Sequence, residues 1–200
     1  SETSAVCLVG KSHDFHVEKA LGISLDENLN NISSSISHLV GQKREVIFDA
    51  EHFFDGFKDN PGYAIQTLKS ALNAGAKWVV LCDTNGGCLP NEIKETLADV
   101  MLQDIAGDSL GIHAHNDTEN AVANTLAAID AGVRQIQGTL NGLGERCGNA
   151  NLTSIIPSLL LKSPYMDKFE TRISMSALSS LTRISRQLDD IINRIPLRQA

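Results

Sequence analysis

The sequence has no apolar run long enough to cross a membrane. Its apolar stretches, such as 78–82, fall far short of the ~20 residues that a spanning helix needs, and residues 1–20 lack the layout of a signal peptide. Basic residues are also few, since 17 Lys and Arg stand against 24 Asp and Glu and the formal charge is -7. A general nucleic-acid binder needs a basic face to neutralise phosphates. We therefore expect a cytoplasmic protein with no nucleic-acid partner and no membrane partner.

Cysteine is scarce as well. Cys7, Cys82, Cys88 and Cys147 are too few and too irregularly spaced for a disulfide scaffold, and no CxxC pair indicates a zinc knuckle or a redox site. We expect four reduced thiols. A chain of 200 residues with 42% hydrophobic content has enough apolar surface for one core, which fits one domain or a large piece of one.

Short β-rich apolar segments alternate with segments of helical periodicity. Strands are predicted over 5–9, 45–48, 78–82, 110–114 and 134–138, and helices over 26–40, 61–74, 90–104, 120–131, 152–161 and 174–193. Pro61 and Pro90 suit the first turn of a helix, Gly75 and Gly132 suit left-handed C-terminal caps, and Pro196 would stop the last helix. Strand-helix alternation predicts an α/β fold with parallel strands, either a doubly wound sheet or a (β/α)8 barrel.

Polar and glycine-rich clusters follow all five predicted strands, at 10–12, 49–52, 83–87, 113–117 and 141–149. A doubly wound sheet concentrates its site at one crevice, whereas all the loops of a barrel ring one mouth. Clusters after every strand therefore favour a barrel. Five strands do not close an eight-stranded barrel, so the prediction is a partial one.

His113 and His115 give the sharpest functional signal. They stand at i and i+2 at the end of a strand, so both imidazoles point to one face and lie close enough to bind one ion. Two imidazoles with oxygen ligands suit zinc, manganese, cobalt or, less well, magnesium. The alternative is a pair of histidines satisfied by neighbours or solvent. Asn116 and Asp117, which follow directly at the predicted mouth, favour the metal.

Residues 138–152 form a glycine-rich loop that runs from a strand into a helix. Such a loop brings backbone close to a ligand, although a long turn that needs positive φ is the alternative. Glu145, Arg146 and Asn149 are charged or strongly hydrogen-bonding groups beside the histidines, and they favour the ligand.

Two more strand ends carry carboxylates. Asp83 and Thr84 end an apolar strand, where a carboxylate and a hydroxyl can hold a polar substrate, and Glu51 ends another. A carboxylate at such a place is as often a helix cap or a salt-bridge partner as a catalyst, so both interpretations of Glu51 stay open on the residues alone.

Taken together, the motifs CDTNGG at 82–87, HAHND at 113–117 and GLGERCGNANL at 142–152 closely resemble those of the 2-isopropylmalate, homocitrate and citramalate synthases. These belong to the metal-dependent TIM barrels that include hydroxymethylglutaryl-CoA lyase. The segments GKS at 10–12, with Asp14 and His16, and DAEHFFDG at 49–56 look most like citramalate synthases, which join pyruvate to acetyl-CoA.

The resemblance covers residues 5 to about 195 and implies a partial TIM (β/α)8 barrel, about strands 4 to 8 with their helices plus a C-terminal helix. Residues 1–161 would be the C-terminal part of the catalytic barrel, and 162–200 a linker and helix leading to a further subdomain. The family's first three strands, with an Arg-Asp-Gly motif that supplies another metal ligand, lie outside this sequence. We therefore expect a chain truncated at both ends.

The resemblance also implies a role for each candidate residue. The metal ligands would be His113, His115 and Asn149, the catalytic residues Glu51 and Arg146, and the substrate-binding residues Thr84, Asp83 and His16. The implied activity is condensation of acetyl-CoA with pyruvate to citramalate and CoA, in isoleucine biosynthesis. Separately, the apolar stripe of the predicted helix over 174–193 could form a homodimer contact as readily as pack on its own barrel, and we expect a homodimer. The alternatives are a synthase that uses another 2-oxo acid, a lyase that cleaves an acyl-CoA, and a non-catalytic fragment or paralogue that acts as a binding partner.

Overall fold

The computed structural model describes residues 3–195, and within them five strands form one parallel sheet in the order β1-β2-β3-β4-β5. The strands are β1 (Ala5–Lys11), β2 (Glu45–Glu51), β3 (Trp78–Asp83), β4 (Leu110–Ala114) and β5 (Gln135–Gln137). All five predicted strands are confirmed. The first three run longer than predicted, so Lys11, Asp49 and Glu51 belong to strands and not to the loops that follow them.

Four helices connect these strands along the chain, and they are α2 (Leu25–Gly41), α4 (Pro61–Asn73), α5 (Pro90–Met101) and α6 (Ala121–Ala131). Pro61 and Pro90 occupy the first turn of their helices, and Gly75 and Gly132 have φ of 101° and 120°, as predicted. The helix predicted over 90–104 is too long. Asp104 has φ of 64°, a left-handed conformation that no α-helix continues through.

Several short elements were not predicted: α1 (Asp14–His16), the π-helix η1 (Val17–Leu21), α3 (Phe53–Asp59) and the 3-10 turns η2 (Gly107–Ser109) and η3 (Leu140–Gly142). A run of seven residues or fewer is too short to show a helical period. Helix α3 begins directly after His52, whose φ of 56° turns the chain out of β2. This turn places the first residues of α3 beside the end of the strand.

The C-terminal part consists of α7 (Leu152–Leu161), α8 (Ser163–Met166), α9 (Met175–Leu178) and α10 (Leu181–Ile191). The prediction of one helix over 174–193 is wrong, because the chain breaks between α9 and α10. At the break Ser179 Oγ donates to the Ser176 carbonyl at 2.7 Å, a local bond that competes with continued helix. Pro196 lies outside the described residues, and the division predicted between 1–161 and 162–200 stays a prediction.

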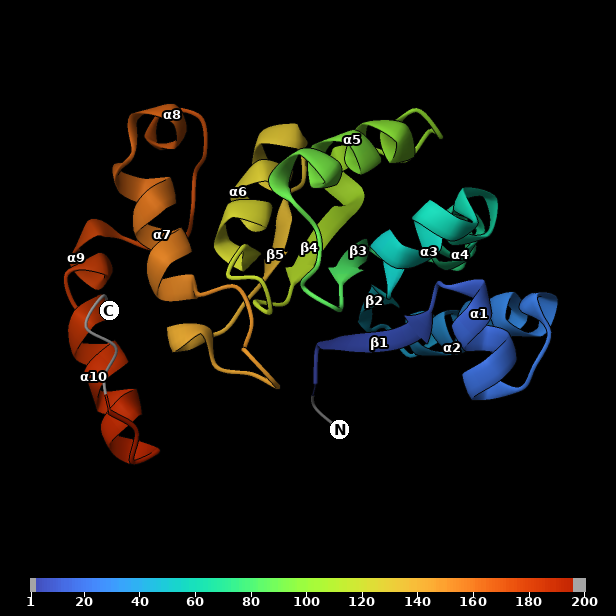
Figure 1. Ribbon diagram of the computed structural model, residues 1–200, viewed down its shortest axis with the longest axis horizontal. Helices are drawn as coiled ribbons and strands as arrows, with labels where there is room; N and C mark the ends of the chain where they lie inside the picture. Colours follow the sequence, from blue (N-terminus) through green and yellow to red (C-terminus); the bar gives the residue numbers. More distant parts are fainter. Residues whose placement is uncertain (1–2, 196–200) are drawn as a thin grey trace.

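The two faces of the sheet differ in chemistry. Phe48, Leu81 and Ile112 are fully buried under the helices, while Asp49 of β2 and Gln137 of β5 point to the opposite face. Gln137 Nε2 donates to Asp49 Oδ1 at 2.7 Å, although β3 and β4 lie between their strands. Only a curved sheet brings these side chains together, so the polar face is the inner one. The helices lie on the outer side of the curve (Figure 1).

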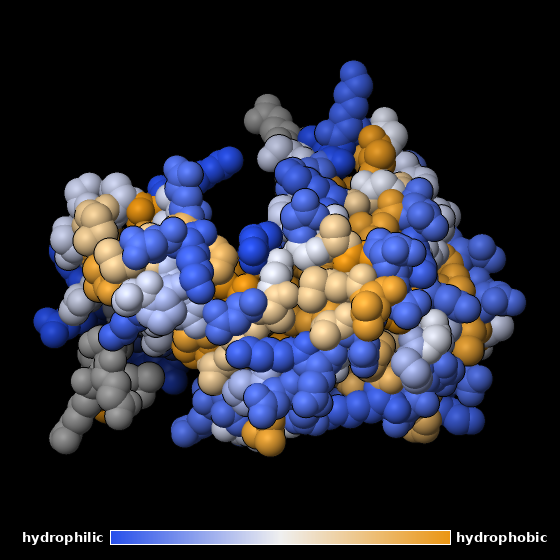
Figure 2. All heavy atoms as spheres, turned by 90° about the horizontal axis from the view of Figure 1, so that it is seen from above, coloured by the Kyte–Doolittle hydropathy of each residue, from blue (hydrophilic) through white to orange (hydrophobic). Residues whose placement is uncertain are grey.

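The strand order decides between the two predicted architectures. A doubly wound sheet reverses its strand order at a switch point, whereas a barrel adds each parallel strand beside the last. The order here is sequential throughout, so the described chain forms an arc of a barrel. Helices α7–α10 stand to one side of the arc, across an open notch in the molecular surface (Figure 2). In the described residues, no helix combines the length and hydrophobicity that crossing a membrane requires.

Candidate active site

The two histidines of β4 lie side by side at the mouth of the arc. Their rings are stacked with centroids 5.1 Å apart and planes 7° from parallel. His113 is within β4, and His115 follows the strand and pairs with Asn149 in an isolated antiparallel bridge. The predicted shared face is therefore confirmed, and the glycine-rich loop lies directly against it.

Asn149 reaches His113 from this loop. Its Nδ2 lies 2.8 Å from His113 Nε2. Since the two ends of a carboxamide are nearly isosteric, the same position suits an N–H donor to the ring or, with the amide turned over, an oxygen ligand beside it. A Cβ on Gly144 would lie 1.8 Å from Asn149 Oδ1, so only glycine there leaves room for this amide.

The other side of the His113 ring contacts two residues that the sequence analysis did not single out. Nδ1 lies 2.7 Å from Gln137 Oε1 and 3.5 Å from Asp49 Oδ2. The carboxylate of Asp49, a residue that is only 5% exposed, raises the pKa of His113 above its usual value, against the effect of burial. The available signal was the pairing of Asp49 with Glu51 at i and i+2, directly after the apolar residues 46–48 of β2.

A second set of metal-type ligands lies on the side of the His113 ring that faces Asp49. Single atoms of Asp49, Cys82 and His113 all lie within 4.8 Å of one another. An ion there would need the Nδ1 lone pair, and Gln137 Oε1 already occupies hydrogen-bond distance from that atom. We therefore place the candidate metal site at the Nε2 end of His113, beside His115 and Asn149. These three residues offer imidazole and amide ligands, which suit a divalent cation.

Arg146 ties the glycine-rich loop to the ends of β3 and β4. Its Nε and one terminal nitrogen donate to the two Asp117 oxygens at 2.7 and 3.0 Å, and the same terminal nitrogen donates to the Thr84 carbonyl at 2.6 Å. Hydrogen bonds from Arg146 hold the pKa of the Asp117 carboxyl below its usual range. The guanidinium also lies 3.2 Å from His115 Nδ1, and burial, followed by the charges of His113 and Arg146, lowers the pKa of His115.

Thr84 and Asp83 face opposite sides of β3. Thr84 Oγ1 accepts from the His52 backbone N–H at 2.8 Å, beside the end of β2. The Asp83 carboxylate is buried on the helix side, where it accepts from Gly87, Cys88 and Asn124. Burial raises the pKa of Asp83 despite these donors. Substrate binding by either residue stays a prediction, but only Thr84 lies toward the other predicted site residues.

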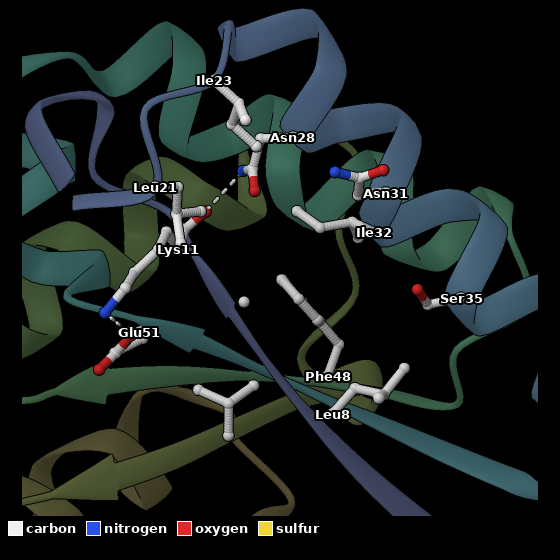
Figure 3. Close-up of a pocket in the computed structure, with 12 residues that line it drawn as sticks. Leu8, Lys11, Leu21, Ile23, Asn28, Asn31, Ile32, Ser35, Phe48 and Glu51 are labelled. Atoms are coloured by element: carbon white, nitrogen blue, oxygen red, sulfur yellow. Dashed lines mark hydrogen bonds and ion pairs between the residues drawn. The ribbon is translucent and has the colours of Figure 1, made fainter. Parts of the chain in front are cut away.

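Glu51 lies at the other end of the site, on the last residue of β2. It forms an ion pair with Lys11 of β1, and the two side chains meet at one end of a hollow of about 390 Å³ (Figure 3). The rest of this hollow is mostly apolar and lies between β1 and α2, where Phe48 and Ile32 approach each other. Within the described residues β1 pairs with β2 alone, so the hollow runs along a free strand edge.

His16 belongs to a cluster of three imidazoles. Its ring stacks on His13 with centroids 4.9 Å apart and meets the edge of His52 at 4.2 Å. Among the described residues its Nδ1 is buried and has no hydrogen-bond partner. Burial, followed by the nearby His52, lowers the pKa of His16. The ring lines a hollow of about 310 Å³ together with Asp55, Lys58 and Asn85.

The predicted residues thus form one chain of contacts. Asn149 contacts His113, and the ring of His113 stacks on His115. Arg146 contacts both His115 and Thr84. Thr84 in turn contacts His52, whose ring meets that of His16. Glu51 precedes His52 in sequence. The side chain of Asp83 is the exception, because it points away into the helical layer.

Comparison with known proteins gives this geometry a context. Residues 1–185 match the HMGL-like family. The chain is 52% identical to the (R)-citramalate synthase of Aquifex aeolicus, over 96% of this chain and 35% of that protein. It is 50% identical to the (R)-citramalate synthase of Synechocystis, over 97% of this chain and 36% of that protein. A 2-isopropylmalate synthase of Solidesulfovibrio magneticus is 33% identical over 86% of this chain and 33% of its own length. The chain spans about a third of the length of these relatives.

Solved structures confirm the fold. The HMG-CoA lyase of Bacillus subtilis superposes with a TM-score of 0.81 at 19% identity, over 98% of this chain and 66% of that one. The HMG-CoA lyase of Acinetobacter baumannii, solved in complex with coenzyme A and 3-methylmalate, gives a TM-score of 0.75 at 20% identity, over 98% and 64%. The arc of five strands is therefore part of a barrel of the HMG-CoA lyase type, as predicted.

Proposed function

Because this chain belongs to the HMGL-like family, we propose that it forms part of a citramalate synthase, an acyltransferase that condenses acetyl-CoA with pyruvate to give citramalate and CoA. The observation that carries the proposal is the site around the stacked pair His113 and His115, with Asn149 at the Nε2 end of His113. The difference in identity between the citramalate and the 2-isopropylmalate synthases supports pyruvate over a larger 2-oxo acid.

The residues present fit a divalent cation. His113 Nε2, the His115 imidazole and the Asn149 amide would hold it, with a further ligand from outside this chain. Imidazole and oxygen ligands suit manganese, zinc, cobalt or magnesium. Once bound, the ion would supply Lewis acidity to the ketone of the 2-oxo acid. The Arg146–Asp117 pair holds the loop that carries Asn149 against the histidines.

Glu51 would act as the base of the reaction. As a carboxylate it would take a proton from the methyl group of acetyl-CoA, and the methyl carbon would then bond to the ketone carbon of pyruvate. The ketone oxygen, which becomes an alkoxide, would take up the proton held by Glu51 and so return Glu51 to the carboxylate. Lys11 forms an ion pair with Glu51 and holds the carboxylate at the end of β2. Water then cleaves the thioester and releases CoA with its thiol protonated. The Thr84 hydroxyl and the His16 ring would bind the 2-oxo acid, and Arg146 would neutralise negative charge.

The proposal also covers the cellular compartment of the enzyme and its association into a dimer. All four cysteines lie within the described residues and are free, which supports a reducing compartment such as the cytoplasm. The end of α10 at Ile191 and the following residue Ile192 are exposed, a feature that supports a homodimer contact. A place in isoleucine biosynthesis follows only if pyruvate is the substrate.

The test is thiol release from acetyl-CoA by the complete protein with added manganese or zinc. Pyruvate, 2-oxoisovalerate and 2-oxoglutarate are compared, and we expect release with pyruvate. His113→Ala should abolish the signal, while His38→Ala, at an exposed histidine of α2, should retain it. Preference for another oxo acid would indicate a different synthase, and silence with all three would refute the proposal.

Removal of the metal provides a second test. Treatment with a chelator should abolish thiol release, and addition of manganese should restore it, because the ketone would lose its Lewis acid. Release that survives exhaustive chelation would contradict the metal-dependent mechanism. A chelated protein that no longer unfolds cooperatively would show instead that the metal acts on the fold.

A further inference from the structure

The hydrogen-bond partners of His113 determine which of its nitrogens carries the proton. Gln137 Oε1, at 2.7 Å from Nδ1, and Asp49 Oδ2, at 3.5 Å, are both acceptors. Nδ1 must therefore donate. In the neutral ring Nε2 then keeps its lone pair, and this is the end that Asn149 approaches at 2.8 Å.

The Gln137 side-chain amide has one preferred orientation, with its oxygen and not its nitrogen toward the ring of His113. Its Nε2 donates to Asp49 Oδ1 at 2.7 Å, and a carboxylate accepts from N–H but offers it no hydrogen. This bond directs Oε1 toward His113. The Asp49 carboxylate thus orients the amide with one oxygen and faces the imidazole with the other, so the three side chains form a closed triangle.

We propose that Asp49 and Gln137 are positioning residues that fix the Nδ1–H tautomer of His113 and hold its Nε2 lone pair toward the divalent cation of the proposed function, on which this inference rests. Metal-ligating histidines commonly donate their second N–H to a carboxylate or carbonyl oxygen, and loss of that partner weakens metal affinity about 10- to 100-fold. Neither residue would contact the metal or the substrate.

A purely structural role is the competing explanation. Asp49 is nearly fully buried, and any buried carboxylate needs hydrogen-bond donors whether or not a metal lies near. The two roles predict different measurements. A structural role changes the unfolding midpoint alone, whereas a positioning role also changes metal affinity and the protonation pattern of one imidazole in the folded protein.

The experiment measures Mn²⁺ affinity of the complete protein from the electron paramagnetic resonance signal of free Mn²⁺. Asp49→Asn replaces the acceptor by an amide that can no longer direct Gln137, and Gln137→Met removes the hydrogen bonds to His113 and Asp49 at similar volume. We expect each variant to bind Mn²⁺ about 10- to 100-fold more weakly. Phe48→Leu, on the opposite face of β2, controls for lost stability and should bind like the parent protein.

A second measurement follows the tautomer itself. In metal-free protein labelled with ¹⁵N-histidine, His113 should show a protonated Nδ1 and an unprotonated Nε2, assigned by comparison with His113→Ala. Asp49→Asn should populate both tautomers. If Asp49→Asn does not fold, Gln137→Met decides the question, because Gln137 is less buried.

The possible failures are distinguishable. Parental Mn²⁺ affinity and an unchanged tautomer in both variants, with binding abolished by His113→Ala, would overturn the positioning role and leave the proposed function intact. Parental affinity in both His113→Ala and His115→Ala would overturn the metal site itself, and the proposed function with it. Weakened affinity in Phe48→Leu equal to that in Asp49→Asn would assign the effect to stability.

Discussion

Replacing Gly144 by alanine tests whether the position of Asn149 controls the site. An added Cβ would lie 1.8 Å from Asn149 Oδ1, whereas ordinary contact begins at 3.4 Å. The amide must therefore retreat by about 1.6 Å, the difference between these two distances. A displacement of that size breaks the 2.8 Å contact with His113 Nε2.

The expected effect is larger on activity than on stability. A misplacement of about 1 Å in a catalytic arrangement can cost about 100-fold in rate, while a lost hydrogen bond costs only about 1 kcal/mol of stability. We expect Gly144→Ala to fold, to lose about 100-fold in thiol release and to bind metal more weakly. Thiol release at saturating substrate, the Mn²⁺ affinity and the unfolding midpoint are measured together.

Gly87→Ala is the matched control. Gly87 lies in the glycine-rich turn after β3, its φ is not positive, and a Cβ there meets nothing within 4 Å. It should behave like the parent protein in all three measurements. Parental activity and metal affinity in Gly144→Ala would refute the reasoning, because the amide would then have moved without consequence.

Further predictions concern the two contacts that hold the glycine-rich loop. Asp189→Ala removes a 3.0 Å acceptor from the buried Asn141 amide and should lower the free energy of unfolding by about 1–3 kcal/mol in chemical denaturation, while Asp190→Ala, at the exposed neighbour, should have little effect. Asp117 has a lowered pKa in the folded state, so its stabilising effect is complete above the unfolded pKa near 3.8 and is lost as pH falls through the folded value. Asp117→Asn should therefore differ from the parent in unfolding midpoint at pH 7 and converge with it between about pH 5 and pH 2; a constant difference would argue against the ion pair with Arg146.

The strands and the longer helices were predictable because their periods and caps are local. Residues 110–114 show a β-rich run, and Pro90 marks a helix start, without reference to the rest of the chain. The short α3 was not predictable, since it depends on the left-handed turn at His52. The break between α9 and α10 was missed because the apolar spacing continues across Ser179 and Ser180.

Some residues of the candidate site could likewise be predicted from the sequence, and others could not. His113 and His115 were predictable because the period of a strand places i and i+2 on one face. Asp49 and Gln137 were not, because their pairing spans 88 positions in sequence and depends on the curvature of the sheet. The orientations of Asp83 and Thr84 were not predicted separately, although neighbouring residues at a strand end point to opposite sides of the sheet. Substrate binding by Asp83 stays a prediction.

The hydrogen bond from Gln137 to Asp49 has a geometric consequence for the barrel as a whole. It joins β2 to β5 across two intervening strands, as a chord joins two points on an arc. Because the number of strands along the arc is fixed, the length of the chord sets the radius of the arc. One glutamine side chain thus limits how far the mouth can open at the level of His113, and Gln137→Asn, one methylene shorter, would either tighten the curve or release it.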